Sequence, residues 1–384
     1  MNVLFLDQFS VLGGAQQCLL DLLPAIGERG WSARAAVPCA GPLVGILRGR
    51  GMRVEELPSG DYRSGRKSAA DLLQFAADVP RQAAAIGALL DESPTDLVYV
   101  NGPRLLVAAA LAARRRAPIL FHAHHFVTQG SARFLEGFAL RRSKATVAAC
   151  CDAVAQPLRK FVREIHIIPN GTADLGYVAR RFEKQSELRV GIIGRISPGK
   201  GHAELLQAAR ILVPHAPRVR FVVCGAPLFG DRAYYNDVLH LAAGLPMEFL
   251  DWHNDVAAVM RDLDLLVIPS KHEGMPRVLL EAFSAGLPVV AFPVGGIPEV
   301  IENDVTGFLT RTANSGELAA KLREVLESSQ ERLRVVAVNA RRQWERLYTV
   351  DAYRDRVTNL MARCVPRPIR ETAALPTRRS ARPR

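Results

Sequence analysis

The chain has 384 residues, 49% of them hydrophobic and 23% charged, which predicts a globular protein of two ordinary domains with full cores. Its longest apolar run, residues 105–113, is much shorter than the roughly 20 residues that span a bilayer, and the first residues lack a signal-peptide pattern. These features exclude a membrane-spanning or secreted protein and favour a cytoplasmic one. Six cysteines without CxxC or metal-ligand spacing favour reduced structural thiols.

The net charge of +12 is unevenly distributed. Residues 1–181 carry 22 Lys and Arg against 15 Asp and Glu, and residues 363–384 carry 7 against 1. Such a surface could meet an anionic membrane or an acidic substrate, and simple solubility explains it equally well. Nucleic acid is the weakest of these partners, because no zinc-finger, RNA-binding or basic-zipper pattern accompanies the charge.

The first residues predict a strand, a glycine loop and a helix. Residues 2–7 form the apolar strand, Gly13 and Gly14 the loop, and residues 17–29 the helix. This order is the opening unit of a Rossmann-like domain, although the fuller GxGxxG fingerprint of a dinucleotide site is absent. The two glycines would let the backbone approach a ligand closely, or they simply allow a tight turn.

Further strands are expected at residues 32–38, 96–101, 118–122 and 145–149, with helices between them, one of which covers residues 69–91. Alternation of strands and helices predicts a parallel sheet covered on both faces. The strand at 118–122 runs into His122, His124 and His125. Only His122 and His124 share a face, and no acidic or thiol ligand is near, so we expect no metal there. One of the three would line a crevice and hydrogen-bond a substrate hydroxyl.

Residues 131–144 form a basic amphipathic segment. Phe134, Leu135 and Phe138 recur at helical spacing, with Arg141 and Arg142 following. Such a segment can lie on a membrane surface. We prefer the alternative that the apolar stripe packs in the core, as most such stripes do.

A polar run at 180–187 predicts a linker, and a second sheet begins with residues 188–194. That strand leads into GRISPGKG, in which Arg195 and Lys200 lie on a glycine-containing loop that opens a helix. Two cations and free helix N–H groups suit a diphosphate, whereas a solvated basic turn is the plain alternative. The later pair Asp262 and Asp264 is not a metal site, because it lies at the amino end of a buried strand.

The stretch at 263–292 predicts two buried strands joined by a loop and a helix. Glu273 lies on the loop after the first strand, and Glu281 lies inside the helix eight residues later. In an open α/β sheet, ligands bind at this carboxyl edge. Because carboxylates would repel a phosphate, we expect both glutamates to accept hydrogen bonds from sugar hydroxyls, which predicts a site for a sugar nucleotide.

With GRISPGKG and EGMPRVLLE in order on one chain, the sequence resembles the retaining GT-B glycosyltransferases of the group-one family, family 4. The resemblance covers roughly residues 1–360. It implies an α/β fold of two Rossmann-like, doubly wound parallel-sheet domains facing across a cleft, with a C-terminal helix crossing back. It also implies transfer of a hexose-type sugar from a UDP- or GDP-sugar to an acceptor hydroxyl, with retention, no metal and no cofactor.

The resemblance also assigns site residues. Catalytic roles fall on His124, Arg195, Lys200 and Glu273, and donor contacts on Gly13, Gly14, Arg195, Lys200, Glu273, Gly274, Met275, Arg277, Val278 and Glu281. Arg195 and Lys200 would neutralise the leaving diphosphate. Glu273 would contact the sugar and Glu281 the ribose, while His124 is the preferred one of the three histidines.

We expect an acceptor domain over residues 1–182, a donor domain over 188–345, a crossover helix over 346–362 and a basic disordered tail over 363–384. The expected partners are a nucleotide-sugar donor, a glycan or lipid-linked acceptor in cell-surface polysaccharide or glycolipid assembly, and an anionic membrane at its inner face. The alternatives are a sugar-nucleotide epimerase, a phosphorylase, or a non-catalytic sugar-nucleotide or lipid-surface binding protein.

Overall fold

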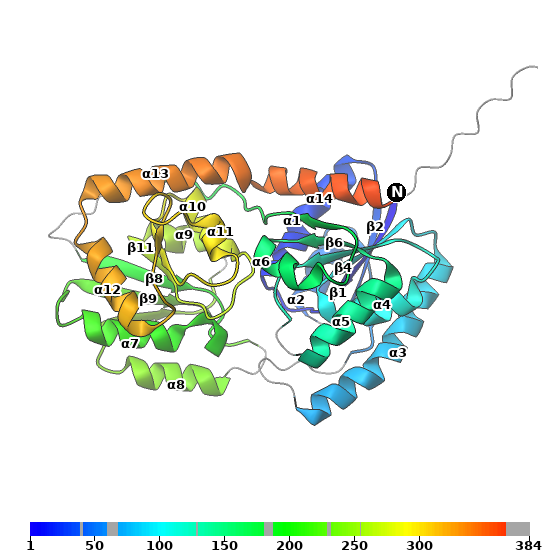
Figure 1. Cartoon of the computed structure of the whole chain (residues 1–384), viewed down its shortest axis with the longest axis horizontal. Helices are drawn as coiled ribbons and strands as arrows, with labels where there is room; N and C mark the ends of the chain where they lie inside the picture. The colour runs from blue at the N-terminus through cyan, green and yellow to red at the C-terminus, as the bar shows by residue number, and fades with distance from the viewer. Residues whose placement is uncertain are drawn as a thin grey trace, which may run out of the picture.

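The structure is a computed structural model that describes residues 1–38, 41–59, 68–127, 130–179, 187–228, 232–253 and 255–365. It contains two parallel sheets, each covered by helices, side by side in Figure 1. The linker expected at 180–187 falls outside the described residues except for Glu187, and the disorder expected in the tail concerns residues that are almost all outside them.

The N-terminal sheet has seven parallel strands in the order β3-β2-β1-β4-β5-β6-β7. Its strands are β1 (Asn2–Asp7), β2 (Ser32–Pro38), β3 (Arg53–Leu57), β4 (Leu97–Asn101), β5 (Ile119–Ala123), β6 (Thr146–Ala149) and β7 (Ile165–Ile167). Its helices are α1 (Gly14–Glu28), α2 (Pro42–Gly49), α3 (Ala69–Glu92), α4 (Leu106–Ala112), α5 (Gly130–Ser143) and α6 (Asp152–Ala155). The order reverses at β1, so β1 and β4 border the switch point where open sheets bind ligands.

The C-terminal sheet has six parallel strands in the order β10-β9-β8-β11-β12-β13. Its strands are β8 (Leu188–Ile193), β9 (Val219–Cys224), β10 (Met247–Leu250), β11 (Leu265–Ile268), β12 (Val289–Ala291) and β13 (Phe308–Leu309). Its helices are α7 (His202–Leu212), α8 (Arg232–Ala242), α9 (Val256–Arg261), α10 (Arg277–Ser284), α11 (Ile297–Val300) and α12 (Ser315–Leu326). Here the switch point lies between β8 and β11, the strands that precede the two predicted donor motifs.

Two final helices join the domains. Helix α13 (Gln330–Leu347) runs along the C-terminal domain, and α14 (Val350–Cys364) continues over the N-terminal domain (Figure 1). Helix α14 packs on α1, and the hydroxyl of Tyr353 donates to the Cys18 carbonyl oxygen at 3.2 Å. The chain therefore has the predicted doubly wound architecture with a C-terminal helix that crosses back.

Strands β3 and β7 were not expected from the sequence. β7 reads IHI, too short to show an alternating pattern, and β3 reads RVEEL, whose charges conceal an outer strand. Both lie at sheet edges, where burial on two faces is not required. Their omission leaves the ligand edge unchanged, because that edge is built from the central strands.

The preferred interpretation of residues 131–144 as core was wrong for their aromatic stripe. The side chains of Phe134 and Phe138 are 69% and 51% exposed, and Leu135 is 36% exposed. Helix α5 packs on α4 through its other face, which buries Ala139 and Leu140. Apolar residues lie on more than one face of this helix, so their spacing alone could not show which face is buried.

Candidate functional site

Polar side chains follow the central strands of the N-terminal sheet. Asp7 ends β1, Asn101 ends β4 and His124 comes directly after β5. The Asn101 amide nitrogen donates to Asp7 Oδ2 at 2.6 Å, and His124 Nε2 lies 2.7 Å from Asn101 Oδ1. Burial raises the pKa of Asp7 to about 6, although hydrogen bonds from Asn101, Phe9 and Gln16 oppose the shift. The three residues form a connected polar cluster, in which Asp7 and Asn101 are buried and His124 is half-buried.

The three adjacent histidines have different surroundings. His122 is buried and its Nδ1 meets the Tyr99 hydroxyl, so burial lowers the pKa of its ring to about 3. Burial holds the pKa of His124 well below its usual range, and the nearby His122, His125 and Arg277 lower it further. Partial desolvation and the charge of Arg195 lower the pKa of His125, although this residue is exposed at the surface. His122 therefore has a structural environment, and the preference for His124 stays a prediction.

Lys200 and Glu273 meet at the carboxyl edge of the C-terminal sheet. Lys200 Nζ lies 2.6 Å from Glu273 Oε1, and both side chains are mostly buried. Lys200 ends a single 3₁₀ turn, Pro198–Lys200, after which Gly201 has a φ of +77°. A side chain at Gly201 would lie 1.8 Å from the Pro269 carbonyl oxygen, so glycine is required where the two loops approach.

Backbone of the donor loop touches the N-terminal domain directly. A Cβ at Gly274 would lie 2.2 Å from the carbonyl oxygen of His124, and one at Gly295 would lie 1.7 Å from that of Glu273. The Asn170 amide donates to the Met275 carbonyl oxygen at 2.9 Å. His124 and the first residues of the EGMP motif are therefore brought together at the domain junction.

Arg277 connects the same junction to helix α1. Its guanidinium lies 2.8 Å from Asp21 Oδ2 and 3.6 Å from Glu281 Oε1, and it donates to the Gly171 carbonyl oxygen at 2.8 Å. Its Cδ is the atom nearest to a Cβ built on Gly14, at 3.7 Å. Burial raises the pKa of Glu281, although Arg277 opposes the shift. The predicted donor contacts Gly14, Arg277 and Glu281 thus lie together.

The placement of the remaining predicted residues is simpler. Gly13 precedes α1 as its N-cap, Met275 is buried in the core between the domains, and Val278 packs against that core. Arg195 follows β8 on the same loop as Lys200. The contacts in this structure do not test the role assigned to any of these residues, so the site assignment stays a prediction.

Sequence reasoning missed Asp21, Asn101, Asn170 and Glu299. Glu299 accepts hydrogen bonds from the amides of Asp152 and Ala153 at 2.7 and 2.8 Å, which ties α11 to the first turn of α6. Asn101 carries a usable signal, since it is a polar residue ending a buried strand beside β1. Asp21 carries no such signal, because the sequence around a single helical aspartate does not show that its side chain faces another domain.

Asp262 and Asp264 lie at the amino end of β11, as expected, where Asp262 pairs with Arg189 and Asp264 accepts from the Arg189 amide. No group of three potential metal ligands occurs among the described residues. Likewise, no described helix is long and apolar enough to cross a membrane.

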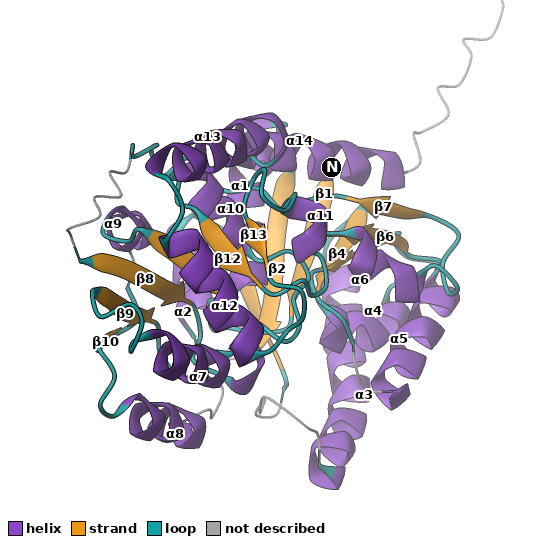
Figure 2. Cartoon of the chain, turned by 60° about the vertical axis from the view of Figure 1, so that its left-hand side comes forward, coloured by secondary structure: helices purple, strands orange, loops and turns teal. Residues whose placement is uncertain are grey.

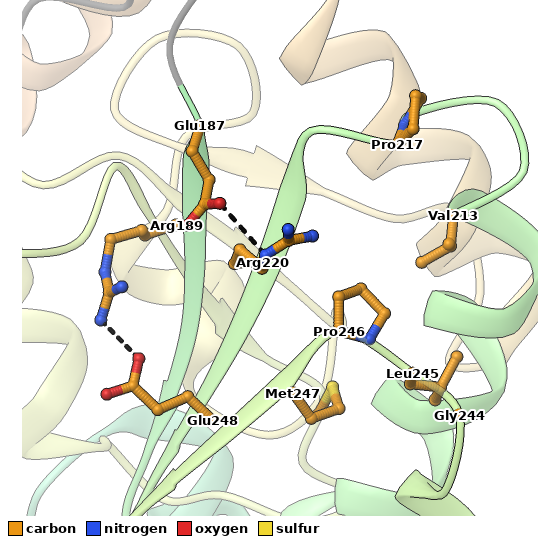
Figure 3. Close-up of a pocket in the computed structure, with 10 residues that line it drawn as sticks. All are labelled: Glu187, Arg189, Val213, Pro217, Arg220, Gly244, Leu245, Pro246, Met247 and Glu248. Carbon is orange, nitrogen blue, oxygen red and sulfur yellow. Dashed lines mark hydrogen bonds and ion pairs between the residues drawn. The ribbon is translucent and has the colours of Figure 1, made fainter.

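An open pocket of about 720 Å³ lies at this amino edge of the C-terminal sheet (Figure 3). Its charges are paired, Arg189 with Glu248 at 2.8 Å and Arg220 with Glu187 at 3.1 Å. It faces away from the strand ends that carry Lys200 and Glu273. We assign it no ligand, because open α/β sheets bind ligands at the opposite edge.

Two family models together cover most of the chain. The model described as "Glycosyl transferases group 1" matches residues 178–343, and the one described as "Glycosyl transferase 4-like domain" matches residues 13–171. The chain belongs to the group 1 glycosyltransferases. Its two parallel sheets form the GT-B fold of that family.

Solved structures align with nearly all of this glycosyltransferase. HepE of Anabaena, crystallised with UDP, is 25% identical, has a TM-score of 0.79 and covers 94% of this chain and 100% of its own. Sucrose-phosphate synthase of Thermosynechococcus elongatus is 19% identical with a TM-score of 0.76, covers 94% of this chain and 99% of its own, and shows the fold alone.

Curated relatives of the glycosyltransferase match over shorter stretches. A galactosyltransferase of Escherichia coli, named for UDP-Gal and alpha-D-GlcNAc-diphosphoundecaprenol, is 27% identical over 252 residues, which are 58% of this chain and 64% of the relative. The D-inositol 3-phosphate glycosyltransferase of Corynebacterium glutamicum is 32% identical over 154 residues, 38% of this chain and 37% of the relative. The chain thus spans less than two thirds of either protein.

Proposed function

We propose that the protein transfers a hexose from a nucleoside diphosphate donor, UDP-linked in the first instance, to an acceptor hydroxyl, with retention and without a metal ion. The observation that carries the proposal is the Lys200–Glu273 pair at 2.6 Å, beside the contact of Gly274 with His124. HepE, 25% identical along its full length, has been crystallised with UDP-glucose, which supports the choice of donor.

Binding of the donor would break this ion pair. Lys200 and Arg195, which lie on the same loop, then bind the diphosphate, and the Glu273 carboxylate becomes available to accept hydrogen bonds from the sugar hydroxyls. Both cations then stabilise the charge that develops on the leaving diphosphate. No protein nucleophile is needed, because the leaving phosphate itself can take the acceptor proton. Glu281, in turn, receives the ribose.

Lys200→Ala tests this assignment. We expect the rate of nucleoside diphosphate release to fall by about 10²–10³-fold, the usual effect of removing one transition-state donor, with an unchanged fold by circular dichroism. Lys271→Ala is the matched control, because Lys271 lies near the same loops but is exposed and pairs with Glu204 at 2.7 Å. Normal turnover by Lys200→Ala would show that Lys200 does not stabilise the leaving diphosphate.

The acceptor is proposed to be a lipid-linked glycan at an anionic membrane, with helix α5 as the contact. Its exposed Phe134 and Phe138 share a face with the exposed Arg141 and Arg142, at i, i+4, i+7 and i+8. The aromatic rings would enter the interface while the guanidinium groups meet lipid phosphates. The undecaprenyl diphosphate acceptor named for the Escherichia coli relative supports this choice.

Sedimentation with phosphatidylcholine vesicles, with and without phosphatidylglycerol, tests the membrane contact. We expect binding that requires the anionic lipid and is lost in Phe134→Ser/Phe138→Ser. Ile211→Ser on α7, where Ile211 is 51% exposed in the other domain, should bind normally. Equal binding by both variants would show that α5 is not the contact.

A further inference from the structure

A continuous chain of hydrogen bonds crosses the ligand edge of the N-terminal sheet. Strands β1, β4 and β5 are neighbours, and the register pairs Asp7 with Asn101 and Asn101 with His122. The side chains at these ends therefore lie in one row. Asp7 Oδ1 accepts from Gln16 Nε2 at 2.7 Å and from the Phe9 amide at 2.9 Å, while its Oδ2 accepts from Asn101.

The surroundings of Asn101 determine which way its amide faces. Its nitrogen donates to Asp7 Oδ2 at 2.6 Å and to the Ala15 carbonyl oxygen at 3.1 Å, which uses both N–H groups. In the flipped orientation the amide oxygen would face the Asp7 carboxylate and the Ala15 carbonyl oxygen, and neither of these can donate a hydrogen bond. The buried Asp7 carboxylate thus directs the amide nitrogen inward and leaves Oδ1 facing His124.

The orientation of Asn101 in turn determines the tautomer of His124. Asn101 Oδ1 can only accept, so the His124 Nε2 at 2.7 Å must carry the proton. The other ring nitrogen, Nδ1, is then a bare acceptor, and it is buried without a hydrogen-bond partner among the described residues. A buried acceptor left unmatched is costly, so such an atom points to a missing donor.

We propose that Asp7 and Asn101 are positioning residues that hold His124 in its Nε2–H tautomer, so that Nδ1 accepts a hydrogen bond from one hydroxyl of the sugar donor. The inference rests on the proposed function, in which His124 contacts that sugar. It adds a specificity rule. The site requires a donating group at one sugar position and rejects an analogue that lacks it, because Nδ1 would remain unpaired.

The same arrangement argues against acid–base work by His124. The low pKa of its ring keeps the imidazole neutral at physiological pH, so it accepts a hydrogen bond without taking the proton. The role of the cluster is orientation, which agrees with a reaction in which the leaving phosphate receives the acceptor proton.

Nitrogen NMR of the full-length protein, labelled with ¹⁵N at histidine, measures the tautomer without any need for activity. His124→Gln assigns the resonances of His124 by their disappearance. We expect a protonated Nε2 and an unprotonated Nδ1 in the wild type. A protonated Nδ1, or a mixture of both tautomers, would overturn the proposal outright.

Two variants separate the relay from a merely structural role. Asn101→Leu is close in size and removes the acceptor, so the Nε2–H preference of His124 should disappear. The reversed pair Asp7→Asn/Asn101→Asp gives up the hydrogen bond from residue 101 to the Ala15 carbonyl oxygen. It keeps an oxygen toward His124 Nε2 and a donor–acceptor match between the two side chains, and should restore the wild-type tautomer. If Asn101→Leu does not fold, the His124 tautomers of the wild type and of the reversed pair still test the relay. A lost tautomer in the reversed pair would contradict the relay.

UDP-hexoses that each lack one hydroxyl test the specificity rule. In the wild type, one of these analogues should lose about 10- to 100-fold in kcat/KM, and that same analogue should lose little further activity in His124→Gln. Equal losses for every analogue in both proteins would refute the contact with Nδ1. If the wild type turns over no UDP-hexose while its tautomer is as predicted, the proposed function fails and the relay stands.

Discussion

Asp7 is the residue at which burial and hydrogen bonding oppose each other most clearly. It is fully buried, it accepts three hydrogen bonds, and its pKa is still raised to about 6. Its charge orients the Asn101 amide, so its protonation state affects the tautomer of His124. Among the residues that the structure describes, its hydrogen-bond partners are Gln16, Asn101 and the Phe9 backbone, none of which is a titratable side chain.

The pH dependence of turnover follows from that raised pKa. Below about pH 6 Asp7 takes a proton, the Asn101 amide loses its charged acceptor, and the orientation of His124 weakens. We expect kcat/KM to fall on the acid side with an apparent pKa of about 6. The reversed pair Asp7→Asn/Asn101→Asp should shift this limb, and an unchanged limb would mean that another group titrates.

Glu136 on α5 gives a separate stability prediction. Burial raises the pKa of its carboxyl to about 7, with Arg133 opposing. Because the folded pKa lies above the unfolded value of 4.5, the folded state binds more protons, and this group lowers stability as pH rises from about 4.5 to 7. The loss is about 3 kcal/mol. Urea titrations should show that Glu136→Gln removes this slope, while a slope equal to that of the wild type would contradict the assignment.

At the scale of elements, the contact between α1 and α10 depends on Arg277. Its partners Asp21 and Glu281 belong to different domains, and its side chain is only 11% exposed. Removing one member of such a buried pair leaves the other charge uncompensated. Arg277 therefore links the geometry of the two domains to Glu281, the carboxylate proposed for the ribose.

Asp21→Asn tests this link. Without its carboxylate, Arg277 retains Glu281 as its nearest anion, and that carboxylate becomes less available to the donor. We expect the donor KM to rise about tenfold with little change in kcat, and the free energy of unfolding to fall by about 3 kcal/mol. The control is Asp355→Asn, because Asp355 is an exposed α14 residue 3.8 Å from Arg29 and should change neither quantity. A donor KM equal to that of the wild type would separate Arg277 from donor binding.

The sequence predicted the elements that carry the ligand edge because their signals are local. Buried parallel strands are continuous apolar runs, so the strand before Lys200 and the strand before Glu273 could both be recognised, and adjacency of their ends follows from the switch-point rule. The pairing of Arg277 with Asp21 could not be predicted, since it joins residues far apart in the chain and depends on how the domains meet. The outward face of α5 was missed for a related reason, because only packing against α4 shows which side is buried.

At the scale of the whole molecule, the two sheets are linked by helices α13 and α14 (Figure 2). They also meet directly at Gly274, which lies against the His124 carbonyl oxygen. One apolar cluster includes buried residues from both domains, such as Cys150 and Leu279. The carboxyl edge of one sheet thus contributes His124 and that of the other contributes Lys200 and Glu273. The predicted catalytic groups lie close together only because the domains meet in this way.

The most direct test of the account is slow hydrolysis of a panel of UDP- and GDP-hexoses by the purified full-length protein, measured as nucleoside diphosphate release alongside thermal stabilisation. One donor, most simply a UDP-hexose, should raise the melting temperature of the wild type and be hydrolysed. The same donor should neither be hydrolysed by Lys200→Ala nor stabilise Glu273→Gln to the same degree. If no sugar nucleotide stabilises the wild type or releases its diphosphate, the site proposed at Lys200, Glu273 and His124 is wrong.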